Sequence, residues 1–182
     1  MDRLQVIADT ERWVREIVVG LELCPFAARP LERGTIRYRV CEEADREGIY
    51  RGVLAEMVAF LSLPESEAET ALFIVPRGLE DFDDYLDLLY ALEEVMPEAG
   101  LEGVLQLASF HPDYLFEGAS PDDPANYSNR SPWPMFHLIR EDLLAEALAR
   151  YPHPEEIPRR NIRTLRALGV EEIRRRAGFG RT

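Results

Sequence analysis

The sequence contains no lysine: all 21 of its basic residues are arginine. A chain without lysine has no side chain of its own that can form a Schiff base with a carbonyl substrate or with pyridoxal phosphate. That class of enzyme is therefore excluded. Because arginine binds carboxylates and phosphates through a planar fork, any anion site in this protein depends on guanidinium groups.

Cysteine is also scarce, with only two residues, Cys24 and Cys41. Two cysteines are too few for the disulfide framework of a small secreted domain, and too few for a structural zinc site made by cysteine alone. No apolar run reaches the roughly 20 residues that a membrane helix needs, and the N-terminus has no basic-then-apolar signal pattern. We therefore expect a cytoplasmic protein with reduced thiols and no membrane partner.

Positively charged residues are fewer than negatively charged ones, 21 against 34. The formal net charge of −13 disfavours nucleic acid as a partner, because affinity for phosphate backbones comes mainly from basic side chains. The hydrophobic content of 46% and the length of 182 residues are typical of a globular protein, and we expect one domain over residues 1–182. The sequence requires no cofactor, and it leaves the oligomeric state open, a homo-oligomer included.

What the sequence does contain is an alternation of helix and strand patterns. Apolar residues at helical spacing predict helices, and short apolar or alternating segments predict strands. The expected helices cover residues 10–22, 44–62, 81–96, 134–151 and 155–177, the last one broken at Gly169. The expected strands cover residues 35–41, 70–76 and 103–110.

This order predicts an α/β sandwich with a small three- to four-stranded, mostly parallel sheet flanked by helices, because helical crossovers join parallel strands. We expect strand 70–76 in the middle and strand 35–41 at an edge, with a short strand near 114–117 as a possible fourth. A ferredoxin-like α+β fold is the alternative. Ligands bind beyond the carboxyl ends of parallel strands, which favours a pocket near Cys41 and His111.

Side chains able to do chemistry concentrate between residues 108 and 141. Two of the three histidines, His111 and His137, lie in this stretch. The 23-residue connection 111–133 is unusually long, and such a loop in a compact domain is often functional. Because its prolines and large aromatic residues argue against disorder, we expect an ordered active-site loop.

The leading hypothesis is a small cytosolic enzyme that acts on a small anionic metabolite by histidine acid/base chemistry. The expected catalytic residues are His111, His137, Asp113 and Glu141. The expected substrate-binding residues are Arg130, Arg140, Asn126, Asn129 and Ser131. Near the start of a helix, His137 would be kept neutral by the helix dipole, and it would share a face with Arg140 and Glu141.

Two alternatives stay open. The first is a metal-binding protein, since two histidines with a carboxylate can bind zinc or non-haem iron, although the spacing matches no compact metal motif. Its ligands would come from His111, His137, Asp113, Asp122 and Asp123. The second is a non-catalytic binding or assembly module that uses the aromatic loop as a docking surface.

Structural roles also compete with functional ones for single residues. His111 is equally a satisfied strand-end histidine, Arg130 a side chain that holds the loop, and Ser131 a helix cap. Cys24 follows the carboxyl end of a predicted helix, where the dipole raises the pKa of a thiol. We therefore expect Cys24 to pack beside Phe26 rather than act as a nucleophile.

Several strings of the sequence together resemble the DUF1415 family of bacterial proteins of uncharacterised function. The resemblance runs over nearly the whole chain and implies no catalytic residues, and Trp133 stands where related sequences are expected to carry tyrosine. The strings are Leu23 to Ala27, Glu69-Thr70, Phe110 to Tyr114, Asn126 to Pro134, His137 to Glu141, and Ile157-Pro158 with Asn161.

Overall fold

A computed structural model describes residues 2–178 of the chain. The strands are β1 (Ile36–Val40), β2 (Thr70–Ile74), β3 (Leu105–Phe110) and β4 (Met135–Arg140). The α-helices are α1 (Arg3–Trp13), α2 (Ala28–Arg33), α3 (Arg46–Ser62), α4 (Phe82–Val95), α5 (Glu141–Arg150), α6 (Ile157–Leu168) and α7 (Val170–Ala177). A π-helical segment, η1 (Val14–Val19), continues α1, and 3₁₀ turns lie at η2 (Pro124–Ser128) and η3 (Pro154–Glu156).

The four strands form one open mixed sheet in the order β1-β2-β4-β3. β1 and β2 are parallel, whereas β4 runs antiparallel to both β2 and β3. The α/β class is confirmed and β1 lies at an edge, but the prediction of a mostly parallel sheet is wrong. The element order β-α-β-α-β-β also differs from the β-α-β-β-α-β order of a ferredoxin-like fold.

The inserted strand β4 is the main departure from the sequence prediction. The expected helix 134–151 is in fact β4 followed directly by α5. Leu138 pairs with Ala71 on one side and with Leu107 on the other, so this strand is central. Because no loop separates the strand from the amphipathic helix after it, the continuous apolar pattern of the two segments predicts a single helix. Residues 114–117 form no strand.

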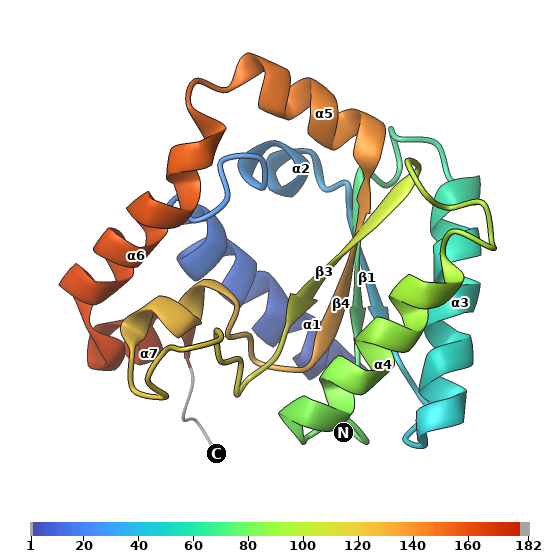
Figure 1. The fold of residues 1–182 in the computed structure, drawn as a ribbon, viewed down its shortest axis with the longest axis horizontal. Helices are drawn as coiled ribbons and strands as arrows, with labels where there is room; N and C mark the ends of the chain where they lie inside the picture. Colours follow the sequence, from blue (N-terminus) through green and yellow to red (C-terminus); the bar gives the residue numbers. More distant parts are fainter. Residues whose placement is uncertain (1, 179–182) are drawn as a thin grey trace.

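Helices cover both faces of the sheet (Figure 1). One face packs against α3 and α4 through a core that includes Phe60, Tyr85 and Phe136. The other face packs against α1, η1, α6 and α7 through a core that includes Trp13 and Met135. Successive side chains of a strand point to opposite faces, so Phe136 and Leu138 of β4 belong to the first core and Met135 to the second.

The long connection after β3 is ordered and packed. It carries the chain back so that β4 lies beside β3, and its turn η2 lies against α6 with Tyr127 buried. Trp13 Nε1 donates a hydrogen bond to the Arg130 carbonyl oxygen over 3.0 Å. This loop therefore closes one end of the core between the sheet and α6.

The predictions for α3, α4 and the pair α6 and α7 agree closely with the structure. Asp45 and Asp81 cap α3 and α4 by accepting backbone N–H bonds, and Gly169 separates α6 from α7. The first helix begins earlier than expected, because Asp2 is its cap and Thr10 lies inside it. None of the helices in residues 2–178 combines the length and the apolar character that crossing a bilayer requires.

Candidate functional site

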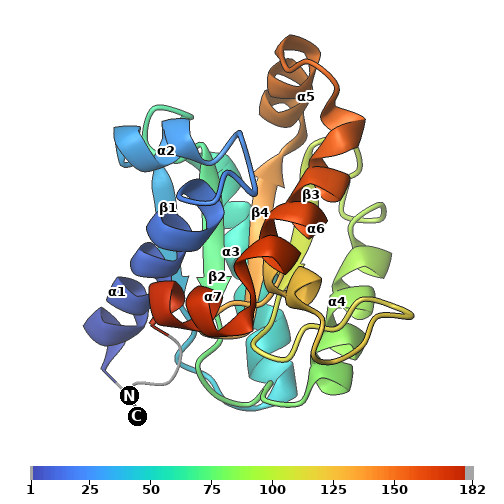
Figure 2. The same ribbon diagram turned by 90° about the vertical axis from the view of Figure 1, so that its left-hand side faces the viewer.

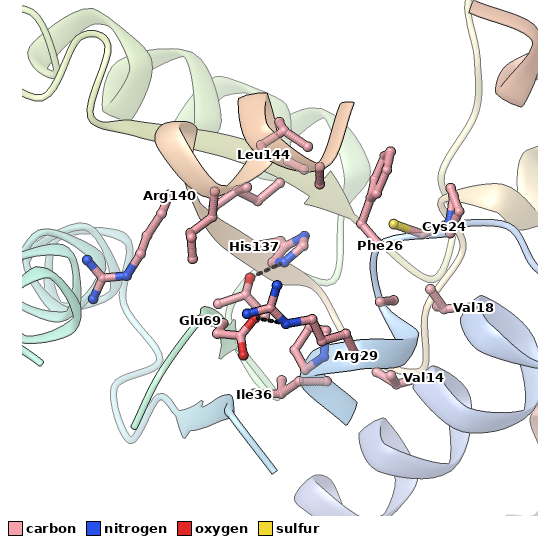
Figure 3. Close-up of a pocket in the computed structure, with 18 of the residues that line it drawn as sticks. Val14, Val18, Cys24, Phe26, Arg29, Ile36, Glu69, His137, Arg140 and Leu144 are labelled. Carbon is pink, nitrogen blue, oxygen red and sulfur yellow. Dashed lines mark hydrogen bonds and ion pairs between the residues drawn. The ribbon is translucent and has the colours of Figure 1, made fainter. Parts of the chain in front are cut away.

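A cavity of about 480 Å³ lies at the end of the sheet where β1 and β2 begin and β4 ends. It lies at the opposite end of the sheet from Cys41 and His111, where the sequence favoured a pocket. α2 and α5 flank this end in Figure 2, and Figure 3 shows the lining side chains. Most of the walls are apolar, formed by Trp13, Val14, Val18, Phe26, Ile36, Leu72, Phe110, Ile139, Leu143 and Leu144.

His137 is the titratable side chain that β4 directs into this hollow, which we call the His137 cavity (Figure 3). Its Nε2 lies 2.6 Å from Thr70 Oγ1, and the same hydroxyl donates to the Leu138 carbonyl oxygen over 2.9 Å. A hydroxyl has only one proton to donate; with that proton directed to Leu138 O, Oγ1 accepts a hydrogen bond from Nε2 of His137. This assignment leaves Nδ1 unprotonated, as an acceptor that faces the cavity.

Burial among these apolar walls lowers the pKa of His137 to about 4. The charged imidazolium is disfavoured because the cavity provides little solvation and no carboxylate beside the ring. His137 is therefore neutral at pH 7. The sequence predicted a neutral His137 from a helix dipole, but the residue lies in a strand and the cause is desolvation.

Cys24 lines the same cavity beside Phe26 (Figure 3). Burial raises the pKa of its thiol, although the backbone N–H groups of Phe26 and Ala27 favour the thiolate. A thiol whose pKa is raised does not transfer its proton to an imidazole whose pKa is lowered. Thiol and imidazole are thus both neutral in the resting protein.

Charged side chains at the cavity are already paired with one another. Glu69 lies 3.5 Å from Arg29 and 3.1 Å from Arg33, and it also accepts a hydrogen bond from the Thr35 hydroxyl. Farther along, Glu146 pairs with Arg150 within α5 at 3.3 Å. Opposite charges therefore cancel around a mainly apolar hollow.

His111 lies on the other face of the sheet from His137. It is fully buried, and its ring contacts Phe82 and Tyr85 at centroid distances of 5.2 Å. Nδ1 accepts the Asp113 N–H and Nε2 lies 3.0 Å from the Leu79 carbonyl oxygen, so Nε2 carries the proton. Burial lowers the pKa of His111. The expected pair of histidines over one hollow is not formed, and His111 has a structural position.

The expected anion-binding residues of the loop bind the loop itself. Arg130 donates to the carbonyl oxygens of Tyr114 and Pro121 over 3.0 Å. The buried Asn126 donates to Ser120 O and accepts from Phe116 N–H. Asn129 donates to Ser109 O, and the Ser131 hydroxyl donates to Trp133 O. None of these four residues lines the His137 cavity.

Arg140 also points away from the expected site, and Glu141 does not line the cavity. The Arg140 guanidinium leaves the cavity edge and donates to the carbonyl oxygens of Phe60 and Leu63, at the carboxyl end of α3 (Figure 3). A cation at a helix carboxyl end is favourable, so Arg140 clamps β4 to α3. Glu141 is the first residue of α5, and its backbone N–H donates to Val104 O.

The alternative metal site is not assembled. Asp113 and Asp122 are exposed, and Asp123 pairs with Arg166 at 2.6 Å, which lowers the pKa of this carboxyl to about 2. With His111 and His137 on opposite faces, the proposed ligands do not converge. Throughout residues 2–178, no three His, Cys, Asp or Glu side chains are grouped closely enough to hold an ion.

Replacing Asn126 with alanine is expected to lower the free energy of unfolding by about 2 kcal/mol, because it leaves Phe116 N–H and Ser120 O without partners. Urea denaturation measures this change. The matched control is Asp122→Ala on the exposed part of the same loop, expected to change stability by less than about 0.5 kcal/mol. Equal stability of the two variants would contradict a structural role for Asn126.

Sequence reasoning missed most of the cavity, including Thr70, Glu69 and the helix α5. A signal was present in the strings that carry the family resemblance. Four of these strings contribute residues to the same cavity: Leu23 to Ala27, Glu69-Thr70, Phe110 to Tyr114 and His137 to Glu141. Only the fold brings them together, since they lie more than 20 residues apart in the sequence.

A family model described as "Protein of unknown function (DUF1415)" matches residues 5–175, nearly the whole chain. Neither a curated protein nor a solved structure matches the sequence.

Proposed function

The chain belongs to the DUF1415 family, and on that premise we propose from its geometry that it binds a small, mainly apolar organic molecule in the His137 cavity. One observation carries the proposal: a neutral imidazole, oriented by Thr70, presents Nδ1 to a mainly apolar hollow. Small-molecule sites combine apolar walls with a few placed polar groups, in volumes of about 300–1,000 Å³. The ligand would carry one hydrogen-bond donor, such as a hydroxyl or an amide N–H, for Nδ1.

This ligand class differs from the small anionic metabolite expected from the sequence. The guanidinium groups of Arg130 and Arg140 are bound to backbone carbonyls, and Arg29 is paired with Glu69. An anion entering the cavity would lose its hydration without an unpaired cation to replace it. An uncharged donor avoids that cost.

Matched probes test the proposal. We expect 2-naphthol to bind about tenfold more tightly than 2-methylnaphthalene, because only the hydroxyl can donate to His137, and one hydrogen bond is worth about 1.4 kcal/mol. Isothermal titration calorimetry at pH 7 measures both constants. In His137→Phe the difference should disappear while the apolar contacts remain.

The control for this substitution is His153→Asn. His153 is exposed and has a positive φ of 54°, which asparagine tolerates, so this variant should keep the tenfold preference. Equal binding of the two probes to the unaltered protein, or no binding of either, would contradict the proposal.

Two substitutions in the same helix test whether the probe binds in the His137 cavity. Ala147 lines the cavity, whereas Ala145 is exposed on the same helix α5. We expect Ala147→Trp to fill the hollow and abolish naphthol binding, and Ala145→Trp to leave it unchanged. Binding that survives in Ala147→Trp would place the probe elsewhere.

Acid/base catalysis by His137 is the second candidate function, favoured by the unpaired Nδ1 in a mainly apolar cavity. A base with a pKa of about 4 abstracts protons weakly at pH 7. A negatively charged substrate would raise that pKa, so a catalytic site predicts proton uptake when 2-naphthoate binds. Calorimetry in buffers of different ionisation enthalpy measures that uptake, and none is expected if the site only binds neutral molecules.

We also propose a cytoplasmic location, which the two unpaired cysteines support.

A further inference from the structure

Helix α5 has an apolar face that the protein does not bury. Leu143, Leu144 and Ala147 line the His137 cavity, yet no residue of α5 reaches full burial. A helix on a globular protein normally packs its apolar stripe against the core. Here that stripe faces the space where we place the ligand.

The helix is held mainly at its ends. Its substantial contacts with another element are with β4, the strand that precedes it directly. In Figure 2 α5 projects beyond the end of the sheet, away from the two cores. At its start, Arg140 fixes the chain to α3 through the carbonyl oxygens of Phe60 and Leu63. The amino end of α5 is therefore an anchored pivot.

The carboxyl end of α5 makes a different kind of attachment. Tyr151 directly follows the helix, its ring lies edge-on to Phe26 at 5.6 Å, and its hydroxyl accepts a hydrogen bond from Arg160 over 2.7 Å. Arg160 also donates to the Glu22 carbonyl oxygen. The next residues are Pro152 and His153, and His153 has a left-handed φ of 54° that favours a sharp turn. Few contacts thus join this end to the wall that carries Cys24.

We propose that α5 is a lid over the His137 cavity and that Tyr151 is its latch. The lid turns about the anchored Arg140-Glu141 junction, and release of Tyr151 from Phe26 and Arg160 widens the partly open mouth of the cavity for the ligand. A bound ligand supplies the packing partner that Leu143, Leu144 and Ala147 lack, so it holds the lid closed. The inference rests on the proposed function and adds the route by which the ligand enters.

Hydrogen exchange tests the lid without any ligand. In the full-length protein, amides of α5 should exchange at least 100-fold faster than those of α4, because an opening of α5 leaves the rest of the fold intact. Saturation with 2-naphthol should slow the exchange of α5 at least tenfold and leave α4 unchanged. If α5 and α4 exchange at equal rates in the unliganded protein, the lid is wrong.

Stopped-flow binding of 2-naphthol tests the latch. Tyr151→Ala removes the Phe26 and Arg160 contacts and should raise both the association and the dissociation rate at least fivefold. Tyr151→Phe keeps the ring contact and should have a smaller effect in the same direction. The control is Tyr90→Ala, an exposed tyrosine of α4 that is 55% accessible, expected to leave both rates unchanged.

The outcomes separate the two proposals. If naphthol binds through His137 but Tyr151→Ala leaves its rates unaltered, the latch fails and the proposed function stands. If naphthol does not bind the unaltered protein, both proposals fail. Faster rates in Tyr151→Ala together with ligand-dependent protection of α5 would support the lid.

Discussion

Replacing His111 with alanine should lower the free energy of unfolding by about 4 kcal/mol. Part of this loss is the cavity left between Phe82 and Tyr85, and part comes from two backbone groups, Leu79 C=O and Asp113 N–H, that lose their partners inside the protein. Urea denaturation followed by circular dichroism measures the change. The sequence alone suggested a loss of catalysis instead.

The control for His111 is again His153→Asn, which changes an exposed histidine and should shift stability by less than about 0.5 kcal/mol. Naphthol binding provides the second readout. Because His111 and the His137 cavity lie on opposite faces of the sheet, the folded His111→Ala protein should bind naphthol with unchanged affinity. A stability within 1 kcal/mol of the unaltered protein would refute the structural role.

Acid should destabilise the protein through His137. The folded pKa of about 4 lies below the unfolded value of about 6.5, so as the pH falls the unfolded chain takes up a proton before the folded protein does. The contribution of the neutral imidazole to the free energy of unfolding is therefore fully present above pH 6.5, and it is lost as the pH falls toward 4. Linkage gives a loss of roughly 3 kcal/mol across this range.

The range from pH 6.5 to 5 isolates the histidines, since unfolded carboxylates take up protons mainly below it. Over this range His137 should account for about 2 kcal/mol of lost stability, and His111, whose pKa burial also lowers, adds to it in the same direction. His137→Phe should flatten the profile by that amount, whereas His153→Asn should leave it unchanged. Parallel profiles for all three proteins would show that His137 is not desolvated in the fold.

Taken together, these experiments assign the two histidines to different roles. His111 is enclosed by aromatic rings and satisfied at both nitrogens, whereas His137 has one satisfied nitrogen and one that faces a cavity. Local sequence does not distinguish them, because each directly follows a phenylalanine and lies within three residues of a proline. Their difference comes from the face of the sheet to which each one points.

For the loop 111–133 the sequence predicted order correctly but did not predict the role of its polar side chains. Its aromatic residues and prolines predicted order, and the loop is indeed packed, with Ala125, Asn126 and Tyr127 buried. Its polar side chains suggested a ligand site. They are used instead to satisfy backbone groups of a long connection that has little regular structure of its own.

The sequence by itself determined the helices α3 and α4, the edge strand β1 and the buried strand β2, because each has a local apolar period and its own turn or cap residues. It did not determine the place of β4, since Met135 to Arg140 run without a break into an amphipathic helix. Tertiary pairing decided that: β4 enters between β2 and β3, which lie more than 20 residues away in the sequence. Because side chains of a strand alternate between the two faces of the sheet, His137 of β4 points to one face. His111, which directly follows β3, points to the other face. The cavity depends on this long-range pairing of β4 with β2 and β3, and no local sequence pattern specifies it.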